Sequence, residues 1–516
     1  MREVARKAPP VLLFVLVLFL AGSAVLGAAE ADRKLRVRFM DSEGGPIPKA
    51  EVGGFHCRNL SDEPIPVRTY VHDGYATVVL PDQPVQVCAL LRVPDFGEVV
   101  ICADGKGKGY SEPGTVDFVK EAAGTRLLRV RSALKQAKSE GVRMPKGFQG
   151  KLVAAERQSS YRCLAIALAA GEELALARAR HRIEKMNGPR KGFLFGCNAM
   201  GHPSRGPDYD RRFRELFNFG TPNLYLSHYA PTETTRDYAR TDAETEWLLS
   251  MGMAAKPCPP FYLAGGVTPE WLKNRPYSEV QRIAHDLVKE VCARYAGRGE
   301  FCEIVNEAHD YSNSLRLKPE DLTDLAGVCS RAAREGDPKV KRIINCCHLW
   351  GEYVGESSAT YPNRRSPYAY LRDCVKAGVG FEIVGLQMYY PEYDLLEIDR
   401  LLDRYAGLGK PIHITEMGCS SAPGLDPNAQ RKRASAGWHG PWTEEMQADW
   451  VEGIYTICYS KPYIKAISWW DLADAVSFWP YGGLLRGDLS PKPAYLRLQS
   501  LLQEWGFEGR PAVPGE

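Results

Sequence analysis

The chain has 516 residues, of which 66 are basic and 63 are acidic, so its formal net charge is +3. Its 44% hydrophobic and 25% charged residues are typical of a globular protein, and they exclude a disordered chain, a collagen-like fibre and a protein with many membrane spans. The balanced charge gives no sign of nucleic-acid binding, which requires clustered lysine and arginine. At this length two or three domains are more common than one.

Residues 1–31 have the parts of a signal peptide in their usual order. Basic residues at the start precede the apolar run VLLFVLVLFLAGSAVLG, and Ala29-Glu30-Ala31 then supplies a small-residue cleavage site. An uncleaved anchor is the alternative, because the 17 residues of the run lie at the lower edge of a membrane span. We expect cleavage, a secreted or periplasmic protein, and no membrane contact afterwards.

Residues 32–131 predict a small all-β sandwich. The candidate strands KLRVRFM, YATVVL, VQVCALLRV, GEVVICA and TRLLRVR are separated by turn signals. The first strand leads into D-x-x-G-x-P-I-P-x-A-x-V, from Asp41 to Val52, and this segment resembles carboxypeptidase-regulatory-like domains. The resemblance implies a spacer or interaction module, and we expect no catalytic set in it.

Residues 132–189 predict a helical connector. The segment SSYRCLAIALAAGEELALARARHRIEKM is rich in alanine, leucine, glutamate and arginine, which are good helix formers. We expect a long helix that packs on its neighbours, with the charged run 178–185 as a solvated face.

Residues 190–506 alternate between apolar runs and amphipathic helical segments. Eight runs read as buried strands: GFLFGCNAM, NLYLSHY, GMAAKPCP, FCEIVNEA, KRIINCCHLW, FEIVGLQMYY, KPIHITEMG and KAISWWDLAD. Eight β–α units predict an α/β fold of the (β/α)8 barrel type. A doubly wound open sheet is the alternative, but no glycine-rich phosphate loop follows the first run.

The 14 cysteines lie mostly inside apolar runs, as Cys346 and Cys347 do. No C-x-x-C pair occurs, and no cysteine and histidine set has zinc-finger spacing. We therefore expect mostly free core thiols with one or two disulfides, no metal site, and no cofactor, since nucleotide and flavin motifs are also missing from the sequence.

Polar and aromatic residues recur where the predicted strands end, which is where barrel enzymes carry their catalytic groups. They are Asn306 and Glu307 after the fourth run, Gln387 and Tyr389 after the sixth, Glu416 after the seventh, and Trp470 and Trp479 around the eighth. Each alone could be a core or ion-pair residue. Together they favour glycoside hydrolysis, because two carboxyls can cleave the bond while aromatic rings stack on sugar faces.

At these residues the sequence resembles glycoside hydrolase family 10, the endo-β-1,4-xylanase family, over about 190–505. The segment E-I-V-N-E-A resembles the family's acid/base strand, which implies that Glu307 is the acid/base and that Asn306 binds the sugar 2-hydroxyl. The segment H-I-T-E-M resembles the nucleophile strand, which implies that Glu416 is the nucleophile.

Further segments extend the resemblance to residues that bind the substrate. G-L-Q-M-Y stands at the family's Q-x-H, so Gln387 carries over and Tyr389 replaces a histidine. The S-W-W-D-L-A-D and S-F-W segments imply Trp470 and Trp479 as sugar platforms, and F-N-F-G-T-P-N implies Asn223.

The sequence also departs from the family. Pro222 and Leu226 stand where the family has glutamate and lysine, and Cys258 and Tyr262 align with its histidine and tryptophan. These departures predict a decorated xylan or another β-glycan as the preferred substrate, with its substituent facing Leu226 and Cys258.

We predict a retaining, endo-acting glycoside hydrolase that cleaves β-1,4 linkages in a xylan-like plant polysaccharide by a two-carboxylate double displacement. Its partner is the polysaccharide or oligosaccharide substrate, and the oligomeric state is left open. Two alternatives are a retaining hydrolase of another β-glycan and a non-catalytic glycan-binding relic. The relic is disfavoured because both carboxylates are present.

Overall fold

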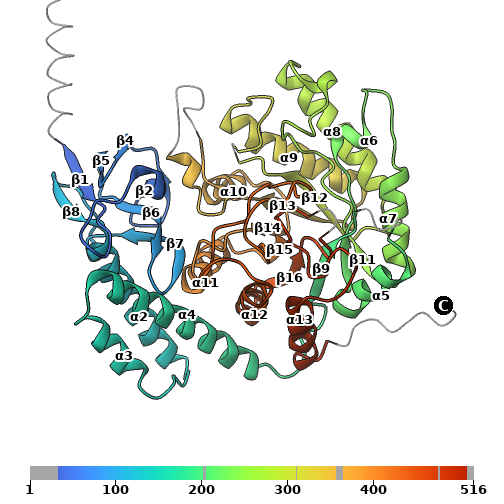
Figure 1. Ribbon diagram of the computed structural model, residues 1–516. Helices are drawn as coiled ribbons and strands as arrows, with labels where there is room; N and C mark the ends of the chain where they lie inside the picture. Colours follow the sequence, from blue (N-terminus) through green and yellow to red (C-terminus); the bar gives the residue numbers. More distant parts are fainter. Residues whose placement is uncertain (1–32, 201–204, 310, 356–363, 475–476, 508–516) are drawn as a thin grey trace, which may run out of the picture.

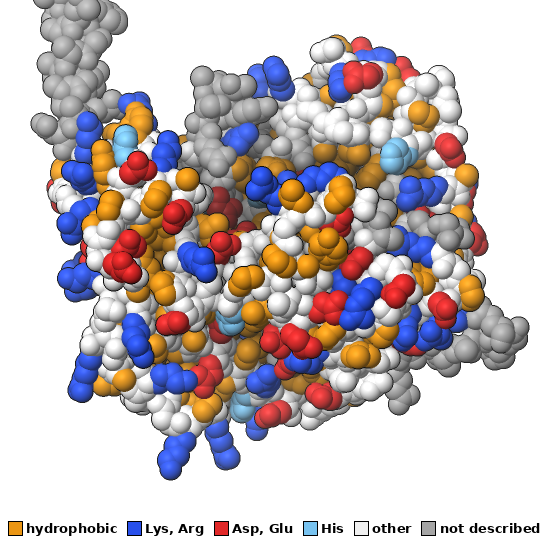
Figure 2. Space-filling model, in the orientation of Figure 1, with side chains coloured by type: hydrophobic (Ala, Val, Ile, Leu, Met, Phe, Trp, Pro, Cys, Tyr) orange, Lys and Arg blue, Asp and Glu red, His pale blue; other side chains and the backbone are white. Residues whose placement is uncertain are grey.

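The computed structural model describes residues 33–200, 205–309, 311–355, 364–474 and 477–507 (Figure 1). The predicted signal peptide lies outside these residues. Within them, none of the helices combines the length and the apolar character needed to cross a membrane. On the face drawn in Figure 2, basic and acidic side chains are interspersed rather than gathered by sign.

The N-terminal domain is a sandwich of two four-stranded sheets, as predicted. One sheet has the order β4-β5-β1-β8 and the other β3-β2-β6-β7. The strands are β1 (Lys34–Arg38), β2 (Gly53–Arg58), β3 (Pro64–Ile65), β4 (Thr69–His72), β5 (Tyr75–Val79), β6 (Gln86–Val93), β7 (Gly97–Ala103) and β8 (Gly114–Asp117). Side chains alternate between core and solvent along β1, and Leu35 and Val37 fill the interior.

The structure contains one disulfide among its described residues, Cys88–Cys102, which joins paired positions of β6 and β7. The other twelve cysteines are free and buried. The expectation of core thiols with one or two disulfides is therefore confirmed.

The predicted strand TRLLRVR is wrong, because this segment lies inside helix α2 (Phe118–Ser139). Its apolar residues recur at helical spacing, so that Leu127, Val130 and Leu134 are all buried on one face. The side chain of Asp117 accepts a hydrogen bond from the backbone N–H of Lys120 and so caps the helix. The sandwich strands consequently end at Asp117 rather than at 131.

The helical connector is confirmed and consists of α2, α3 (Phe148–Ala155) and α4 (Ser160–Glu184). Helix α4 packs against α2 on one side and against the barrel helices α11 and α12 on the other. Arg178 is therefore not part of a solvated face: it is buried between Glu140 and Asp399 and forms ion pairs with both.

Eight parallel strands form the barrel, in the order β11-β10-β9-β16-β15-β14-β13-β12. They are β9 (Leu194–Asn198), β10 (Phe219–Thr221), β11 (Ala254–Ala255), β12 (Phe301–Asn306), β13 (Lys341–Cys346), β14 (Ile383–Met388), β15 (Ile412–Met417) and β16 (Ile464–Trp469). Parallel bridges from Ala255 to Gly299 and from Tyr262 to Asn306 join the two ends of this order and close the barrel. The predicted (β/α)8 fold is thus confirmed.

Helices surround the barrel (Figure 1). They are α5 (Pro207–Leu216), α6 (Leu226–Tyr229), α7 (Ala239–Ser250), α8 (Tyr277–Arg294), α9 (Pro319–Gly336), α10 (Pro367–Lys376), α11 (Leu395–Ala406), α12 (Glu444–Ser460) and α13 (Pro493–Glu504). The second predicted strand is misplaced, because the run NLYLSHY holds α6 and the strand is Phe219–Thr221. The run is apolar because Leu226 and Tyr229 are core residues of a short helix.

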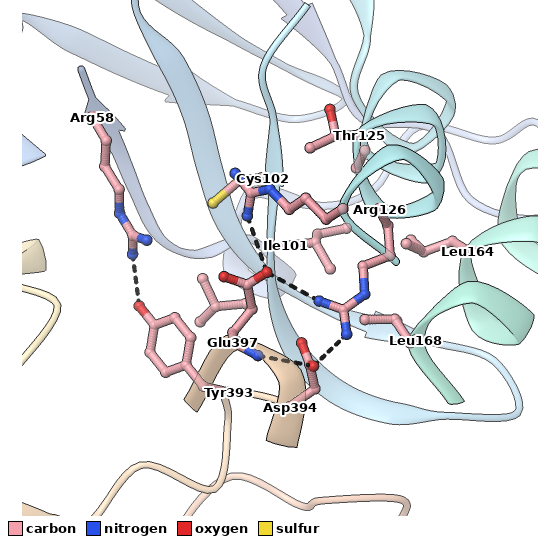
Figure 3. A pocket seen from close by; sticks show the side chains of 13 residues that line it. Arg58, Ile101, Cys102, Thr125, Arg126, Leu164, Leu168, Tyr393, Asp394 and Glu397 are labelled. Carbon is pink, nitrogen blue, oxygen red and sulfur yellow. Dashed lines mark hydrogen bonds and ion pairs between the residues drawn. The ribbon is translucent and has the colours of Figure 1, made fainter. Parts of the chain in front are cut away.

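Buried ion pairs connect the connector to the barrel, as Figure 3 shows. Arg126 of α2 pairs with Asp394 and, at 3.1 Å, with Glu397 of α11. Arg129 also reaches Glu397 at 3.1 Å. The cavity between these groups is only about 20 Å³, so the interface is closely packed.

Candidate active site

A cleft of about 660 Å³ opens at the carboxyl ends of the barrel strands. Its walls combine carboxylates, amides and many aromatic rings. The lining side chains that matter below are Tyr225, Tyr262, Asn306, Glu307, Ser312, Tyr353, Gln387, Tyr389, Tyr390, Glu392, Glu416, Arg431, Trp470, Phe478 and Trp479.

Glu307 follows directly after β12 and has a left-handed backbone with φ of 51°. This conformation is uncommon for a residue with a side chain, and such strain concentrates at functional sites. Tyr262 Oη at 2.7 Å and Ser312 Oγ at 2.6 Å donate to one carboxyl oxygen of Glu307. Gln387 Nε2 donates to the other at 2.9 Å, so three strands and loops fix this carboxyl in the cleft.

Glu416 lies near the end of β15 and faces the same cleft. Tyr389 Oη donates to one of its carboxyl oxygens at 3.1 Å, and Asn345 Nδ2 donates to the other at 3.2 Å. Burial and the nearby negative charge of Glu307 raise the pKa of Glu416 to about 8. The cleft therefore keeps a proton on Glu416 to a higher pH than an exposed glutamate would hold one.

A buried polar network lies beneath the carboxyls. Asn345 Nδ2 also donates to Asn306 Oδ1 at 3.0 Å, and Thr415 Oγ1 donates to Asn345 Oδ1 at 2.6 Å. Deeper in the barrel, Lys256 and Glu303 form a buried ion pair, and the charge of Lys256 lowers the pKa of Glu416 against the stronger effect of burial. This network orients Asn306 and Glu416 from below.

Sequence reasoning missed Asn345 and Lys256, although a signal for both was present. Each is a polar residue inside an otherwise apolar run, in KRIINCCHLW and in GMAAKPCP. A polar side chain on a strand buried on both faces needs a partner, and here the partners belong to the polar network beneath Glu307 and Glu416.

Aromatic rings surround the two carboxyls. Tyr389 stacks on Phe478 with ring centroids 4.4 Å apart, and Trp470 and Trp479 line the same side of the cleft. Tyr225 and Tyr262 line the same cleft, with ring centroids 6.2 Å apart. Such rings offer the flat apolar faces on which pyranose rings stack.

The structure brings seven of the eight predicted site residues to the cleft: Asn306, Glu307, Gln387, Tyr389, Glu416, Trp470 and Trp479. Asn223 is not among the lining residues. It is buried behind the wall, where its Oδ1 accepts from the backbone N–H of Tyr225 at 3.3 Å.

Leu226 and Cys258 are also core residues, with exposed fractions of 0% and 3%, and neither lines the cleft. The expectation that a substituent would face them is therefore wrong. Leu226 turns inward because it starts the short helix α6, and the preceding Tyr225 takes the cleft position instead.

Within the described residues, no group of three or more histidine, cysteine, aspartate or glutamate side chains could hold a metal ion. The polar groups of the cleft are suited instead to acid–base and nucleophilic chemistry on an uncharged, hydroxyl-rich ligand.

A (β/α)8 barrel with two carboxyls at its mouth, amides beside them and aromatic walls defines the class of barrel glycosidases. Comparison with known families agrees with this class: residues 264–500 match the model of glycosyl hydrolase family 10, and this segment contains the last five barrel strands. Over these residues the barrel of this chain is similar to glycosyl hydrolase family 10.

Individual proteins are also similar. Endo-1,4-beta-xylanase B of Thermotoga neapolitana is 29% identical over 252 residues, which is 46% of this chain and 66% of that protein. Endo-1,4-beta-xylanase B of Neocallimastix patriciarum is 25% identical over 46% of this chain and 26% of that protein. The matches to these two relatives thus span less than two thirds of their lengths. A solved family 10 structure from Paenibacillus barcinonensis is 18% identical over 65% of this chain and 98% of that chain, with a TM-score of 0.49.

Proposed function

We propose that the protein is a retaining, endo-acting glycoside hydrolase that cleaves β-1,4 linkages in a xylan-like plant polysaccharide. The observation that carries this proposal is the placement of Glu307 and Glu416 in one aromatic-walled cleft, each held by its own set of hydrogen-bond donors. A retaining mechanism needs one carboxyl as acid/base and a second as nucleophile.

In the first step a carboxylate oxygen of Glu416 attacks the anomeric carbon of the bound sugar. The bond from that carbon to the glycosidic oxygen breaks, its electron pair stays on the oxygen, and Glu307 gives that oxygen a proton. Tyr389 and Asn345 orient the attacking carboxylate, because they already hydrogen-bond both of its oxygens.

In the second step the Glu307 carboxylate removes a proton from water. The water oxygen attacks the anomeric carbon, and Glu416 leaves with the electron pair of the ester bond. Two inversions at the anomeric carbon restore the β configuration. Asn306 is placed beside both carboxyls, where an amide can hydrogen-bond the sugar 2-hydroxyl.

The xylan-like substrate is supported by the similar proteins, which are named endo-1,4-beta-xylanases. The predicted signal peptide supports a secreted or periplasmic role in polysaccharide degradation, including xylan degradation. A second candidate, another β-glycan, is favoured by Leu226 and Cys258, which stand where the resembled family has lysine and histidine but lie buried away from the cleft.

The test is hydrolysis of a panel of β-1,4-linked oligosaccharides and their aryl glycosides by the purified protein. The proposal predicts that xylo-oligosaccharides, plain or decorated, are cleaved with higher kcat/KM than gluco- or manno-oligosaccharides of equal length. A preference for another backbone sugar would replace xylan as the substrate, and no hydrolysis of any member would reject the enzyme.

A further inference from the structure

The substrate cleft is not built from the barrel alone. Three residues of the N-terminal sandwich, Gly54, Leu90 and Val100, line the same cavity as Glu307 and Glu416. They come from β2, β6 and β7, which belong to one sheet, so this sheet forms a wall of the cleft.

Backbone hydrogen bonds hold this wall against the barrel loops. The N–H of Val100 donates to the carbonyl of Glu392 at 2.7 Å, and the N–H of Glu98 donates to the carbonyl of Gly437 at 3.0 Å. Gly97 also forms an antiparallel bridge with Trp438. The edge strand β7 is thereby joined to loops of the barrel, as an added strand would be.

Side-chain hydrogen bonds next to the cleft also join the sandwich to the barrel loops. Arg58 of β2 donates to Tyr393 Oη at 2.9 Å, and Tyr393 in turn donates to Glu352, which lines the cleft. Arg58 is buried, so separating the sandwich from the barrel would leave its charge without this hydrogen bond, which costs free energy. Together with the ion pairs of Arg126 in Figure 3, these contacts pack the N-terminal part of the chain directly against the barrel.

The barrel loops next to the sandwich show which side of the cleft the sandwich borders. Glu392 and Tyr353 come from the loops after β14 and β13, whereas Tyr225 and Tyr262 line the side of the cleft formed by the loops after β10 and β11. The sandwich therefore borders the β13–β14 side of the cleft.

We propose that the N-terminal sandwich is part of the substrate-binding site: it ends the cleft on the β13–β14 side and so limits how many sugar units bind there. This inference rests on the proposed function. A glycan that lies across Glu307 and Glu416 can continue on the opposite side, but on the β13–β14 side only the sugars next to the cleavage point remain inside.

Leu90 offers the sharpest test, because it is half-buried in the wall and its side chain can be enlarged or removed. We expect Leu90→Trp to narrow the closed side and lower kcat/KM on xylohexaose at least 10-fold. Hydrolysis of an aryl β-xyloside, which is too short to reach the wall, should stay within 2-fold of the original protein. Leu90→Ala should widen the closed side instead. It should shift the cleavage position in end-labelled xylohexaose by at least one sugar.

Leu60 supplies the matched control, because it lies in the same domain, is 47% exposed and does not line the cleft. Leu60→Trp and Leu60→Ala should leave both kcat/KM and the cleavage position unchanged. Thermal unfolding of every variant checks that it is folded.

The outcomes separate this inference from the proposed function. Hydrolysis of the aryl glycoside by the original protein tests the function without involving the wall. If that hydrolysis is present and the Leu90 variants match the Leu60 variants in product lengths, the wall inference is overturned. If no glycoside is cleaved, the proposed function fails, and binding of intact oligosaccharides by calorimetry still tests the wall: Leu90→Trp should weaken it at least 10-fold and Leu60→Trp should not.

Discussion

At the scale of single residues, Glu307 and Glu416 have the same chemistry but different surroundings. Glu307 sits on a strained turn and receives hydrogen bonds from Tyr262, Ser312 and Gln387. Glu416 extends from a strand and is held by Tyr389 and Asn345. Their environments separate the two roles, as unequal environments do for carboxyl pairs in general.

Glu416→Ala should abolish the first chemical step, because no other carboxylate of the cleft is placed beside Tyr389 and Asn345. We expect kcat on xylo-oligosaccharides to fall on the order of 10⁴-fold. Added azide should restore turnover of an activated aryl xyloside and give an α-configured glycosyl azide, since a single inversion then occurs. The control Glu320→Gln changes an exposed carboxyl and should leave kcat unchanged. Formation of a β-azide instead would point to a different nucleophile.

Glu307→Gln should remove proton transfer to the leaving group. The loss should be roughly 10²- to 10⁴-fold on oligosaccharides but small on aryl glycosides with good leaving groups, whose oxygens leave without protonation. Equal losses on both substrate types would show that another group is the acid.

The same variant should change the pH profile. In the original protein burial and the Glu307 charge raise the pKa of Glu416 to about 8, so the cleft loses its proton as the pH rises towards that value, and kcat/KM should fall there. In Glu307→Gln the neighbouring charge is gone, the pKa of Glu416 falls, and the basic limb should disappear for activated substrates. An unchanged basic limb in rate measurements from pH 5 to 9 would contradict the pairing.

At the scale of elements, seven of the eight strand predictions hold because a strand buried on both faces leaves a plain apolar run. The one wrong barrel strand, NLYLSHY, and the wrong sandwich strand, TRLLRVR, are segments whose apolar residues are buried by helices instead. Short apolar runs do not distinguish the two cases, since the partner that buries them lies far away in the chain.

Arg126 joins helix α2 to the barrel by an ion pair with Asp394. The side chain of Arg126 is 6% exposed and that of Asp394 is 1% exposed. Arg126→Ala should lower the free energy of unfolding by about 3–5 kcal/mol, because it leaves the buried carboxylate of Asp394 without its ion pair. Arg131→Ala, which breaks an exposed pair with Glu156, should cost less than about 1 kcal/mol. Urea unfolding measures both, and equal effects would mean that the buried pair does not hold the domains together.

At the scale of the whole molecule, the sequence predicts the barrel and the two carboxyls that line one cleft, because strand ends and their residues are local features. It cannot predict that Gly54, Leu90 and Val100 reach the cleft. That placement depends on contacts between residues about 300 positions apart, such as Val100 with Glu392. The same holds for Asn223, which carries a plausible motif but packs behind the wall.

Buried carboxyls also shape the pH dependence of global stability. Burial raises the pKa of Glu416 and of Glu392 to about 8 and of Asp471 to about 7. The folded protein thus keeps protons that the unfolded chain releases near pH 4–5, so the stability these groups contribute is lost as pH rises towards 8. Buried histidines have the opposite effect, but only below about pH 6.5, because burial lowers their pKa values to about 3.

The melting temperature should therefore decrease from pH 6.5 to pH 8, and Glu416→Gln should make this decrease shallower. Calorimetry at four or five pH values in this window measures both slopes. A melting temperature that rises across the window would contradict the raised pKa values.

We propose that Glu307 and Glu416 act as a retaining pair, with carboxyl groups about 5–5.5 Å apart in the enzyme. Proton NMR of freshly cleaved xylo-oligosaccharides tests it most directly, because the anomer that forms first is visible before mutarotation. A retaining pair should release the β-anomer first, and the α-anomer should grow in later. Initial release of the α-anomer would show inversion by a single displacement and would contradict the roles given to both residues.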